Sequence, residues 1–330
     1  MDIAVIGAGA IGGTIAALLD RAGHGVEVSA RGAHLNAIRH GGIRLSGAWG
    51  DHRAEVAAGE RLSRTPELAI LATKAADAAA AARGNASILG AAPLVVVQNG
   101  LGGLEQTAQA NPGSPVVGAL SLIAASMSVP GEIVVTTAAA TWLGMADPAA
   151  PDSPARFAAD VLGEVIPCEV VTNFEGARWT KLIINQVNAL PAITGLSVQQ
   201  VIDDPALREA LSISMQEAAR VGLALGVHFD EVNQVTHAAL VRLAGSPPAE
   251  ADFVALQLRA YLGEVPNPGS TLQSIRRGQA SEIDYLNGAI VSAGRDAGVP
   301  TPVNARLVEL VHEVERSGRF LTPGDVIAAL

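Results

Sequence analysis

The feature that most constrains the fold of this chain is a glycine pattern near its N-terminus. Residues 2–6 form a short apolar run, typical of a buried parallel strand, and residues 11–22 then have the pattern of a helix. Between them lies the G-x-G-x-x-G sequence Gly7-Ala8-Gly9-Ala10-Ile11-Gly12. In this context the glycines permit a tight turn, the approach of a pyrophosphate and close packing of helix on strand. The pattern predicts a dinucleotide-binding unit, and the alternative is a strand–turn–helix with incidental glycines.

The rest of the first half continues this alternation of strand and helix. Residues 75–83 are nearly all alanine, which favours a helix. Further strand-like runs occur at residues 25–30, 67–72, 93–97, 116–123, 132–137 and 165–171. Strands alternating with helices predict an open, mostly parallel sheet.

The second half has the pattern of long helices separated by proline-rich breaks. Helices are predicted at residues 176–190, 205–226, 230–244, 270–298 and 302–316. The predicted fold class is therefore α/β, with an N-terminal Rossmann-type open sheet followed by an all-α C-terminal domain. We expect a dinucleotide-binding domain at residues 1–170 and a helical substrate-binding and catalytic domain at residues 171–330.

Composition excludes several classes of function. Hydrophobic residues make up 49% of the chain and charged residues 16%, enough for a large core, and the net charge of −10 argues against a nucleic-acid partner. No apolar run approaches the roughly 20 residues that span a bilayer, and the N-terminus lacks the pattern of a signal peptide. The prediction is thus a cytoplasmic protein without a membrane partner. Cys168 is the only cysteine, which excludes an intramolecular disulfide and is typical of a small buried apolar residue.

The end of the second predicted strand indicates which dinucleotide binds. An NAD site usually has a carboxylate there, but this chain has Ser29, Ala30 and Arg31. Glu27 lies inside the strand, and we expect it to point elsewhere. Arg31 can pair with a 2′-phosphate, so the sequence favours NADPH over NADH. The alternative for Arg31 is a solvated surface side chain.

A predicted helix at residues 178–188 carries three polar residues on an apolar background. Lys181, Asn185 and Asn188 are spaced so that they share one helix face. Burial would lower the pKa of Lys181 and make it a usable proton donor near neutral pH. The alternative is a lysine that extends to solvent, with two structural or capping asparagines.

A second polar cluster lies in residues 267–273 and 281–288. Ser270 is predicted to be a helix N-cap, which alone could explain its presence. Glu282 has apolar neighbours and needs a cationic or hydrogen-bonding partner, unless it is solvated. No metal ligands are expected among these residues.

Taken together, these segments resemble the ketopantoate reductase family (2-dehydropantoate 2-reductase) over nearly the whole chain. The Glu-Ile-Asp-Tyr-x-Asn-Gly sequence at 282–288 is the most specific of the matching blocks. The others are the glycine loop at 7–12 and residues 30–35, 73–74, 98–102, 179–182, 270–273 and 299–304.

The resemblance implies NADPH-dependent reduction of 2-dehydropantoate to (R)-pantoate in pantothenate synthesis. It implies that Lys181 is the general acid and that Glu282 holds the Lys181 ammonium near the nicotinamide ribose. The residues implied to bind substrate are Lys181, Asn185, Asn188, Asn267 and Ser270. The residues implied to bind cofactor are Gly7, Ala8, Gly9, Ala10, Ile11, Gly12, Arg31, Lys74, Asn99, Ala124 and Glu282.

The chain departs from the family pattern after Asn185. Family members that make pantoate often have a second asparagine four residues later, whereas here Ala189 stands there and the amide is at Asn188. A shift of one residue turns a side chain by about 100° around a helix. A reductase of a different 2-oxo or 3-oxo acid is therefore an open alternative, and so is an NADPH-binding regulator without catalysis. Whether the chain forms a homodimer also stays open.

Overall fold

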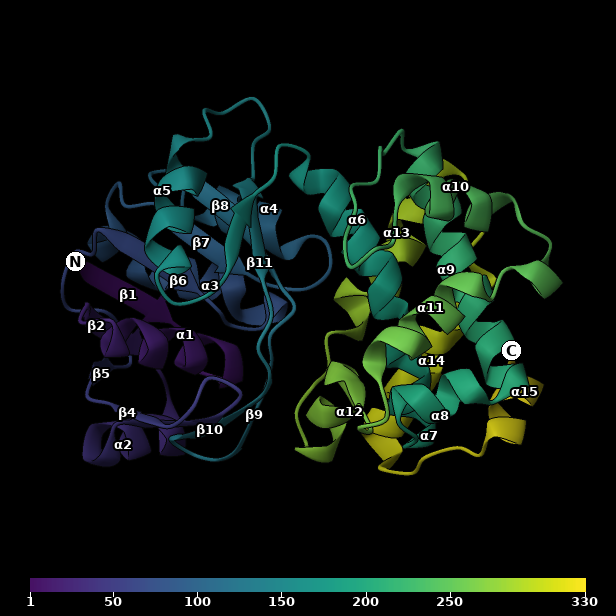
Figure 1. Cartoon of the computed structure of the whole chain (residues 1–330), viewed down its shortest axis with the longest axis horizontal. Coiled ribbons are helices and arrows are strands. Elements are labelled where there is room, and N and C mark those ends of the chain that lie inside the picture. The colour runs from purple at the N-terminus through teal and green to yellow at the C-terminus, as the bar shows by residue number, and fades with distance from the viewer. The chain divides into compact units, whose positions relative to one another are not determined.

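The computed structural model describes residues 1–330 and divides the chain into two compact units (Figure 1). The first, called here the Rossmann unit, comprises Met1–Gln98 and Gly102–Phe174. The second, the helical unit, comprises Asn99–Leu101 and Glu175–Leu330. The expected division at 170/171 stays a prediction.

An eight-stranded, mostly parallel sheet forms the centre of the Rossmann unit. Its order is β12-β11-β8-β7-β6-β1-β2-β5, and all neighbours are parallel except β8 and β11. Short apolar strands suit this sheet because its middle strands are buried on both faces. The strands are β1 (Asp2–Ile6), β2 (Gly25–Ser29), β5 (Ala57–Gly59), β6 (Leu68–Leu71), β7 (Leu94–Val97), β8 (Val116–Ser121), β11 (Thr141–Met145) and β12 (Cys168–Val170).

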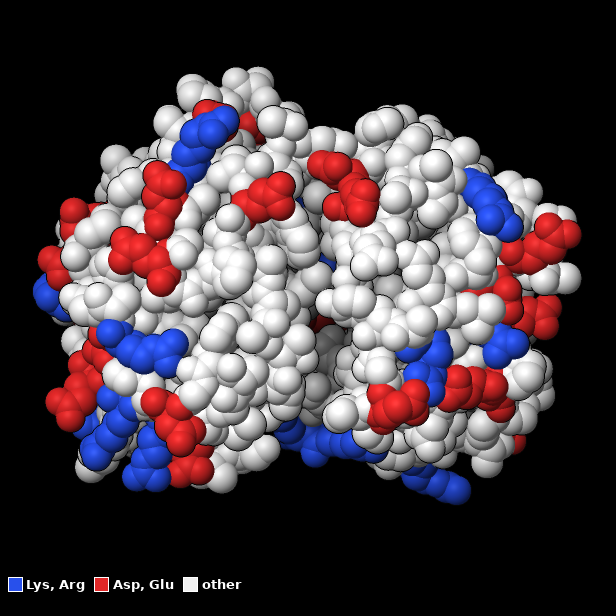
Figure 2. Space-filling model, viewed as in Figure 1, with Lys and Arg blue, Asp and Glu red and all other residues white.

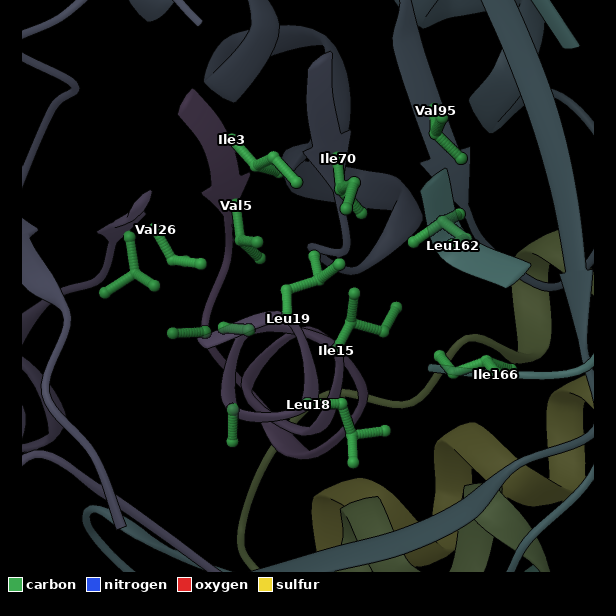
Figure 3. Close-up of a cluster of buried hydrophobic side chains, with 14 of the residues drawn as sticks. Ile3, Val5, Ile15, Leu18, Leu19, Val26, Ile70, Val95, Leu162 and Ile166 are labelled. Atoms are coloured by element: carbon green, nitrogen blue, oxygen red, sulfur yellow. The ribbon is translucent and has the colours of Figure 1, made fainter. Parts of the chain in front are cut away.

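The helices of this unit are α1 (Ala10–Arg21), α2 (Gly32–Gly41), α3 (Ala75–Leu89), α4 (Gly103–Ala110) and α5 (Ser153–Gly163). Helix α1 is the most buried of them, and Ile15 and Leu19 share one apolar cluster with Val5 of β1 and Ile70 of β6 (Figure 3). Cys168 packs half-buried against the same cluster, and burial raises the pKa of its thiol to about 11.

A second, four-stranded sheet covers the other side of α1 and was not predicted. It contains β4 (His52–Ala54), β3 (Ile43–Gly47), β10 (Glu132–Thr137) and β9 (Ala124–Val129), in that order. Helix α1 contacts β3, β4, β9 and β10 as well as β1 and β2. The contact is close at Gly13, where a Cβ would lie 2.3 Å from Ile133 Cδ1. Burial between two sheets explains why α1 is apolar nearly all round.

The helical unit is built around one long helix, α9 (Pro205–Ala224). It packs against α8, α10, α11, α13, α14 and α15. The remaining elements are α6 (Phe174–Ile184), η1 (Asn185–Asn188), α7 (Ala189–Thr194), α8 (Val198–Asp203), α10 (His237–Gly245), η2 (Pro248–Glu250), α11 (Phe253–Leu262), α12 (Gly269–Arg276), η3 (Ile283–Tyr285), α13 (Asn287–Ala297), α14 (Pro302–Ser317) and α15 (Pro323–Ala329). The predicted fold class is confirmed. None of the helices combines the length and apolar character that crossing a bilayer requires.

Three of the five helices predicted for this unit differ from the structure. The helix predicted at 176–190 changes to a 3-10 turn at Asn185, and the one predicted at 230–244 begins only at His237. Asn233 and Gln234 before it have positive φ values, which a helix does not allow. The helix predicted at 270–298 is wrong, because α12 ends at Arg276 and α13 begins at Asn287.

Candidate active site

The glycine loop owes its shape to the packing of α1 on β1. Gly7 has a φ of +93°, which favours glycine, and a Cβ at Gly12 would lie 2.0 Å from the Gly7 carbonyl oxygen. A Cβ at Gly9 would meet nothing within 4 Å, so the backbone there is open to a ligand. Gly9 is also the N-cap of α1 and supplies no side-chain cap, which leaves the first N–H groups of the helix for an anion. The loop fits the pyrophosphate of a dinucleotide.

The loop lies where the strand order of the large sheet reverses. From β1 the sheet runs to β2 and β5 on one side and to β6, β7 and β8 on the other, and ligands of such sheets bind at this switch point. Thr73 follows β6, and its Cγ2 would lie 2.7 Å from a Cβ on Gly7. The Thr73 hydroxyl oxygen is buried and has no hydrogen-bond partner in the protein. Lys74 comes next, as the N-cap of α3.

The end of β2 presents an arginine and no carboxylate. Arg31 is exposed at the N-cap of α2. Glu27 is buried, and its carboxylate accepts hydrogen bonds from the Ser63 N–H at 2.9 Å, the Ser63 hydroxyl at 2.7 Å and the Arg64 N–H at 3.2 Å. Glu27 therefore points away from the end of β2, as predicted, and its carboxylate binds the loop before β6. Ala124, the remaining predicted cofactor residue of this unit, is half-buried at the start of β9.

Lys181 is buried in the apolar helix α6 of the helical unit. In sequence Lys181 follows Trp179 and Thr180 and precedes Leu182, and all three of these neighbours are buried. Lys181 itself is 6% exposed. Burial lowers its pKa from 10.5 to about 8, because taking an ammonium out of water disfavours the charged form. The side chain is therefore not a lysine that extends to solvent.

Asn185 and Asn188 lie in the 3-10 turn η1 that follows α6. Because the α-helix ends at Ile184, the helical spacing used to place all three polar residues on one face does not apply beyond that residue. The Asn185 Nδ2 donates to Asn99 Oδ1 at 3.5 Å. The Asn99–Leu101 segment follows β7 in sequence but belongs to the helical unit, where the Leu101 N–H donates to the Tyr285 carbonyl at 3.1 Å.

Asn188 holds the first turn of α12. Its Oδ1 accepts a hydrogen bond from the Ser270 N–H at 2.9 Å, and its Nδ2 donates to the Asn185 carbonyl at 2.9 Å. Ser270 is not an N-cap, since Pro268 occupies that position, and its exposed side chain lies in the first turn of the helix. The expected cap is wrong because the side chain of Asn188, which is distant in sequence, satisfies the backbone donor.

The loop before α12 is fixed by Gln199, a residue that the sequence did not single out. The buried Gln199 accepts from the Asn267 N–H at 2.9 Å and donates to the Val265 carbonyl at 2.6 Å. The Asn267 Oδ1 accepts from the Gly269 N–H at 2.9 Å. Asn267 therefore stabilises the turn into α12 with its own side chain.

The segment that carries Glu282 is held on both sides by α14. The Glu315 carboxylate accepts from the Ser281 N–H at 2.8 Å, and the His312 ring contacts Glu315 at 2.8 Å and Asp284 at 2.9 Å. Burial alone would lower the pKa of His312, but its hydrogen bonds to Glu315 and Asp284 outweigh burial and raise it. Glu282 is half-buried between these two contacts in sequence.

A buried polar network joins η1 to α13, α14 and α9. The Asn287 Nδ2 donates to Gln186 Oε1 at 2.7 Å and to Asn304 Oδ1 at 3.0 Å. The Glu217 carboxylate accepts from the Val303 N–H at 3.0 Å, the Asn304 N–H at 2.9 Å and the Asn304 Nδ2 at 2.7 Å. The Asn287 Oδ1 is buried without a hydrogen-bond partner, but the other hydrogen bonds of the network join these helices to one another. The network fixes η1, where Asn185 lies.

Charged side chains are dispersed over the face drawn in Figure 2. Figure 2 shows Lys and Arg interspersed with Asp and Glu among uncharged residues, with no continuous basic area on the face drawn. No group of three or more His, Cys, Asp or Glu side chains is placed to hold a metal ion.

Comparison with known proteins agrees with these features. Residues 3–148 match the family described as ketopantoate reductase PanE/ApbA, and residues 173–315 match the C-terminal part of the same family. The chain belongs to the ketopantoate reductase family. Within this family of oxidoreductases, the 2-dehydropantoate 2-reductase of Pyrococcus abyssi is 29% identical over 322 residues, which cover 94% of this chain and 97% of that protein. The enzyme of the same name from Archaeoglobus fulgidus is 28% identical, covering 95% and 97%.

Solved structures show the same fold. A PanE/ApbA family ketopantoate reductase from Ralstonia eutropha matches with a TM-score of 0.80 and 29% identity, covering 96% of this chain and 99% of that one. A D-mandelate dehydrogenase solved with NADH matches with a TM-score of 0.79 and 21% identity, with the same coverage. At that identity the second match concerns the fold alone.

Proposed function

We propose that this ketopantoate reductase family member reduces the ketone of 2-dehydropantoate to (R)-pantoate with NADPH. The observation that carries the proposal is the burial of Lys181 in α6 with a pKa of about 8. A cationic acid with this pKa is largely protonated at neutral pH, yet gives up its proton far more readily than an ordinary lysine.

In the proposed reaction Lys181 donates a proton to the carbonyl oxygen of the substrate. When bound, NADPH supplies the hydride that reaches the carbonyl carbon. Negative charge then develops on the oxygen, and the ammonium stabilises it before transferring its proton. Glu282 would hold the Lys181 ammonium in place.

The remaining site residues divide between substrate and cofactor. Asn185, Asn267 and Ser270 would contact the substrate, and the exposed Ser270 hydroxyl would meet its carboxylate. Asn188 is also proposed at the substrate, although its hydrogen bonds to Ser270 and Asn185 favour a supporting role. The proposed cofactor residues are Gly7, Ala8, Gly9, Ala10, Ile11, Gly12, Arg31, Lys74, Asn99, Ala124 and Glu282.

Arg31 and Glu27 support NADPH over NADH. Arg31 is exposed at the N-cap of α2, directly after β2, and the only carboxylate of β2 accepts hydrogen bonds from Ser63 and Arg64. The fold does not choose the dinucleotide, because the D-mandelate dehydrogenase with the same fold was solved with NADH. We expect R31A to weaken NADPH binding by roughly tenfold or more and to leave NADH binding nearly unchanged. Equal losses for both would remove Arg31 from the 2′-phosphate.

A different 2-oxo acid is the second candidate substrate. It is favoured by Ala189, which stands where the family pattern often has an asparagine. The neighbouring amide of Asn188 does not replace it, because that side chain is hydrogen-bonded within the protein. A D-mandelate dehydrogenase with the same fold was solved with NADH and anilino(oxo)acetate, so the fold alone does not fix 2-dehydropantoate as the substrate.

The deciding experiment follows NADPH oxidation with 2-dehydropantoate and with a panel of other 2-oxo acids, using NADH as the cofactor control. Fast oxidation with 2-dehydropantoate and NADPH supports the proposal. Faster turnover of another 2-oxo acid at low concentration would make that acid the assigned substrate in place of 2-dehydropantoate. Tight NADPH binding without turnover of any 2-oxo acid would favour a regulator.

A further inference from the structure

His34 links the glycine loop to two other parts of the Rossmann unit. It lies in the first turn of α2, three residues after Arg31. Its Nε2 is within hydrogen-bonding distance of the Ala8 carbonyl oxygen in the glycine loop. Its Nδ1 accepts a hydrogen bond at 3.0 Å from the N–H of Gly131, in the turn between β9 and β10.

These two contacts determine which ring nitrogen carries the proton. An Nδ1 that accepts the Gly131 N–H has no hydrogen of its own, so the neutral ring carries its proton on Nε2. The Nε2–H therefore donates to the Ala8 carbonyl. Each nitrogen of His34 has one defined partner.

The Ala8 carbonyl in turn sets the direction of the Gly9 N–H. The two groups belong to one planar trans peptide, in which the C=O and the N–H point in opposite directions. A carbonyl held toward His34 therefore turns the Gly9 N–H away from it. Gly9 is the residue at which the loop is open to a ligand and at which α1 begins.

We propose that His34 is a positioning residue for dinucleotide binding. It holds the Ala8–Gly9 peptide in the orientation that presents its N–H to the pyrophosphate, and it braces that peptide against α2 and the β9–β10 turn. This inference rests on the proposed dinucleotide function of the loop and does not depend on the identity of the substrate. Because every dinucleotide has a pyrophosphate, the effect of His34 concerns NADPH and NADH alike, whereas that of Arg31 concerns NADPH alone.

Three substitutions of His34 separate its two hydrogen bonds. H34A removes both, H34Q keeps a donor at the position of Nε2, and H34N keeps an acceptor at the position of Nδ1. The matched control is H40A, on the same helix, because the Nδ1 of His40 contacts only the Asn36 carbonyl, at 2.7 Å. Dissociation constants for NADPH and NADH are measured by fluorescence titration without substrate, and melting temperatures are recorded for every variant.

H34A is expected to weaken NADPH and NADH by a similar factor, roughly three- to tenfold, as for the loss of one positioning hydrogen bond. H34Q should bind close to the wild type, H34N should bind as weakly as H34A, and H40A should match the wild type. Wild-type affinity in H34A, or H34Q binding no better than H34N, would overturn the proposal. If H34A does not fold, the comparison of H34Q with H34N decides.

Failure of the proposed function gives a different result. A wild-type chain that binds neither dinucleotide defeats the proposed function before any variant is made. A wild-type chain that binds both equally, with H34A weakening both, removes the NADPH preference and keeps the role of His34.

Discussion

Replacing Lys181 with methionine should remove activity and at the same time stabilise the protein. Lys181 is 6% exposed, and burial lowers its pKa from 10.5 to about 8. Because each unit of pKa shift corresponds to about 1.4 kcal/mol, the folded chain disfavours the charged ammonium by roughly 3 kcal/mol. Methionine keeps an unbranched chain of similar length without the charge. The polar groups that contact the ammonium lose a partner, so we expect a net gain of about 1–3 kcal/mol near neutral pH.

The stabilisation should depend on pH in a defined direction. The pKa of Lys181 is lower in the folded chain than in the unfolded one, so the full cost of the buried charge is present below about pH 8. As the pH rises from about 8 to 10.5, the folded chain loses the proton first and the cost disappears. The stability gap between K181M and the wild type should therefore be widest near neutral pH and nearly closed above 10.5.

Urea unfolding of both proteins at several pH values measures this stability gap. In K181M the rate of NADPH oxidation with substrate should fall by roughly 10²-fold or more. The chain has two lysines, Lys74 and Lys181, so NMR of protein labelled at lysine gives two side-chain signals that K181M assigns. A Lys181 signal that titrates near 10.5, or a K181M that is less stable than the wild type at neutral pH, would refute the reasoning.

G12A should lose about 1–3 kcal/mol of stability and also dinucleotide binding, because its Cβ would lie 2.0 Å from a backbone oxygen. G9A should melt like the wild type and lose only dinucleotide binding, because its Cβ would meet nothing within 4 Å. Calorimetry together with NADPH titration distinguishes the two results. E217Q should lower the free energy of unfolding in urea by about 1–3 kcal/mol, since an amide cannot accept all three N–H groups that the carboxylate accepts at the start of α14. An unchanged urea midpoint would contradict this. The pKa of His312 is raised from its ordinary 6.5. The stability that the protonated His312 contributes is therefore fully present below pH 6.5 and is lost as the pH rises through the raised pKa. H312Q should therefore lower the melting temperature more at about pH 6 than at about pH 9, and equal losses would show that the charge of His312 is not involved.

The centre of the Rossmann unit was predictable because its signals are local, whereas α2, α4, α5, β5 and β11 were not predicted. The glycine loop, the buried strands and the absence of a carboxylate after Ser29 all occur within a few residues of the features they determine. Glu27 was expected to point away from the end of β2, and its bonds to Ser63 and Arg64 confirm this. The second sheet was missed because β3 pairs with β10, a strand almost ninety residues away in sequence, and only the strand at 132–137 was recognised.

The helical unit was predicted in class but not in detail. The stretch 277–286 fits a helical pattern, yet two of its backbone groups have distant partners. The Ser281 N–H donates to Glu315, and the Tyr285 carbonyl accepts from the Leu101 N–H. Ser270 looked like a cap because serine is common there, and only the fold places Asn188 beneath it. These contacts join residues far apart in sequence, so local propensity cannot reveal them.

The path of the chain also limits how family members can be recombined. The polypeptide passes from one unit to the other after Gln98, after Leu101 and after Phe174. A chimera that joins the helical unit of one reductase to the Rossmann unit of another at a single crossover near residue 175 would combine Leu101 of one parent with Tyr285 of the other, although the two residues are hydrogen-bonded within one unit. Transfer of residues 99–101 together with 175–330 keeps that pairing, and a library for new keto-acid substrates is best built with this discontinuous insert.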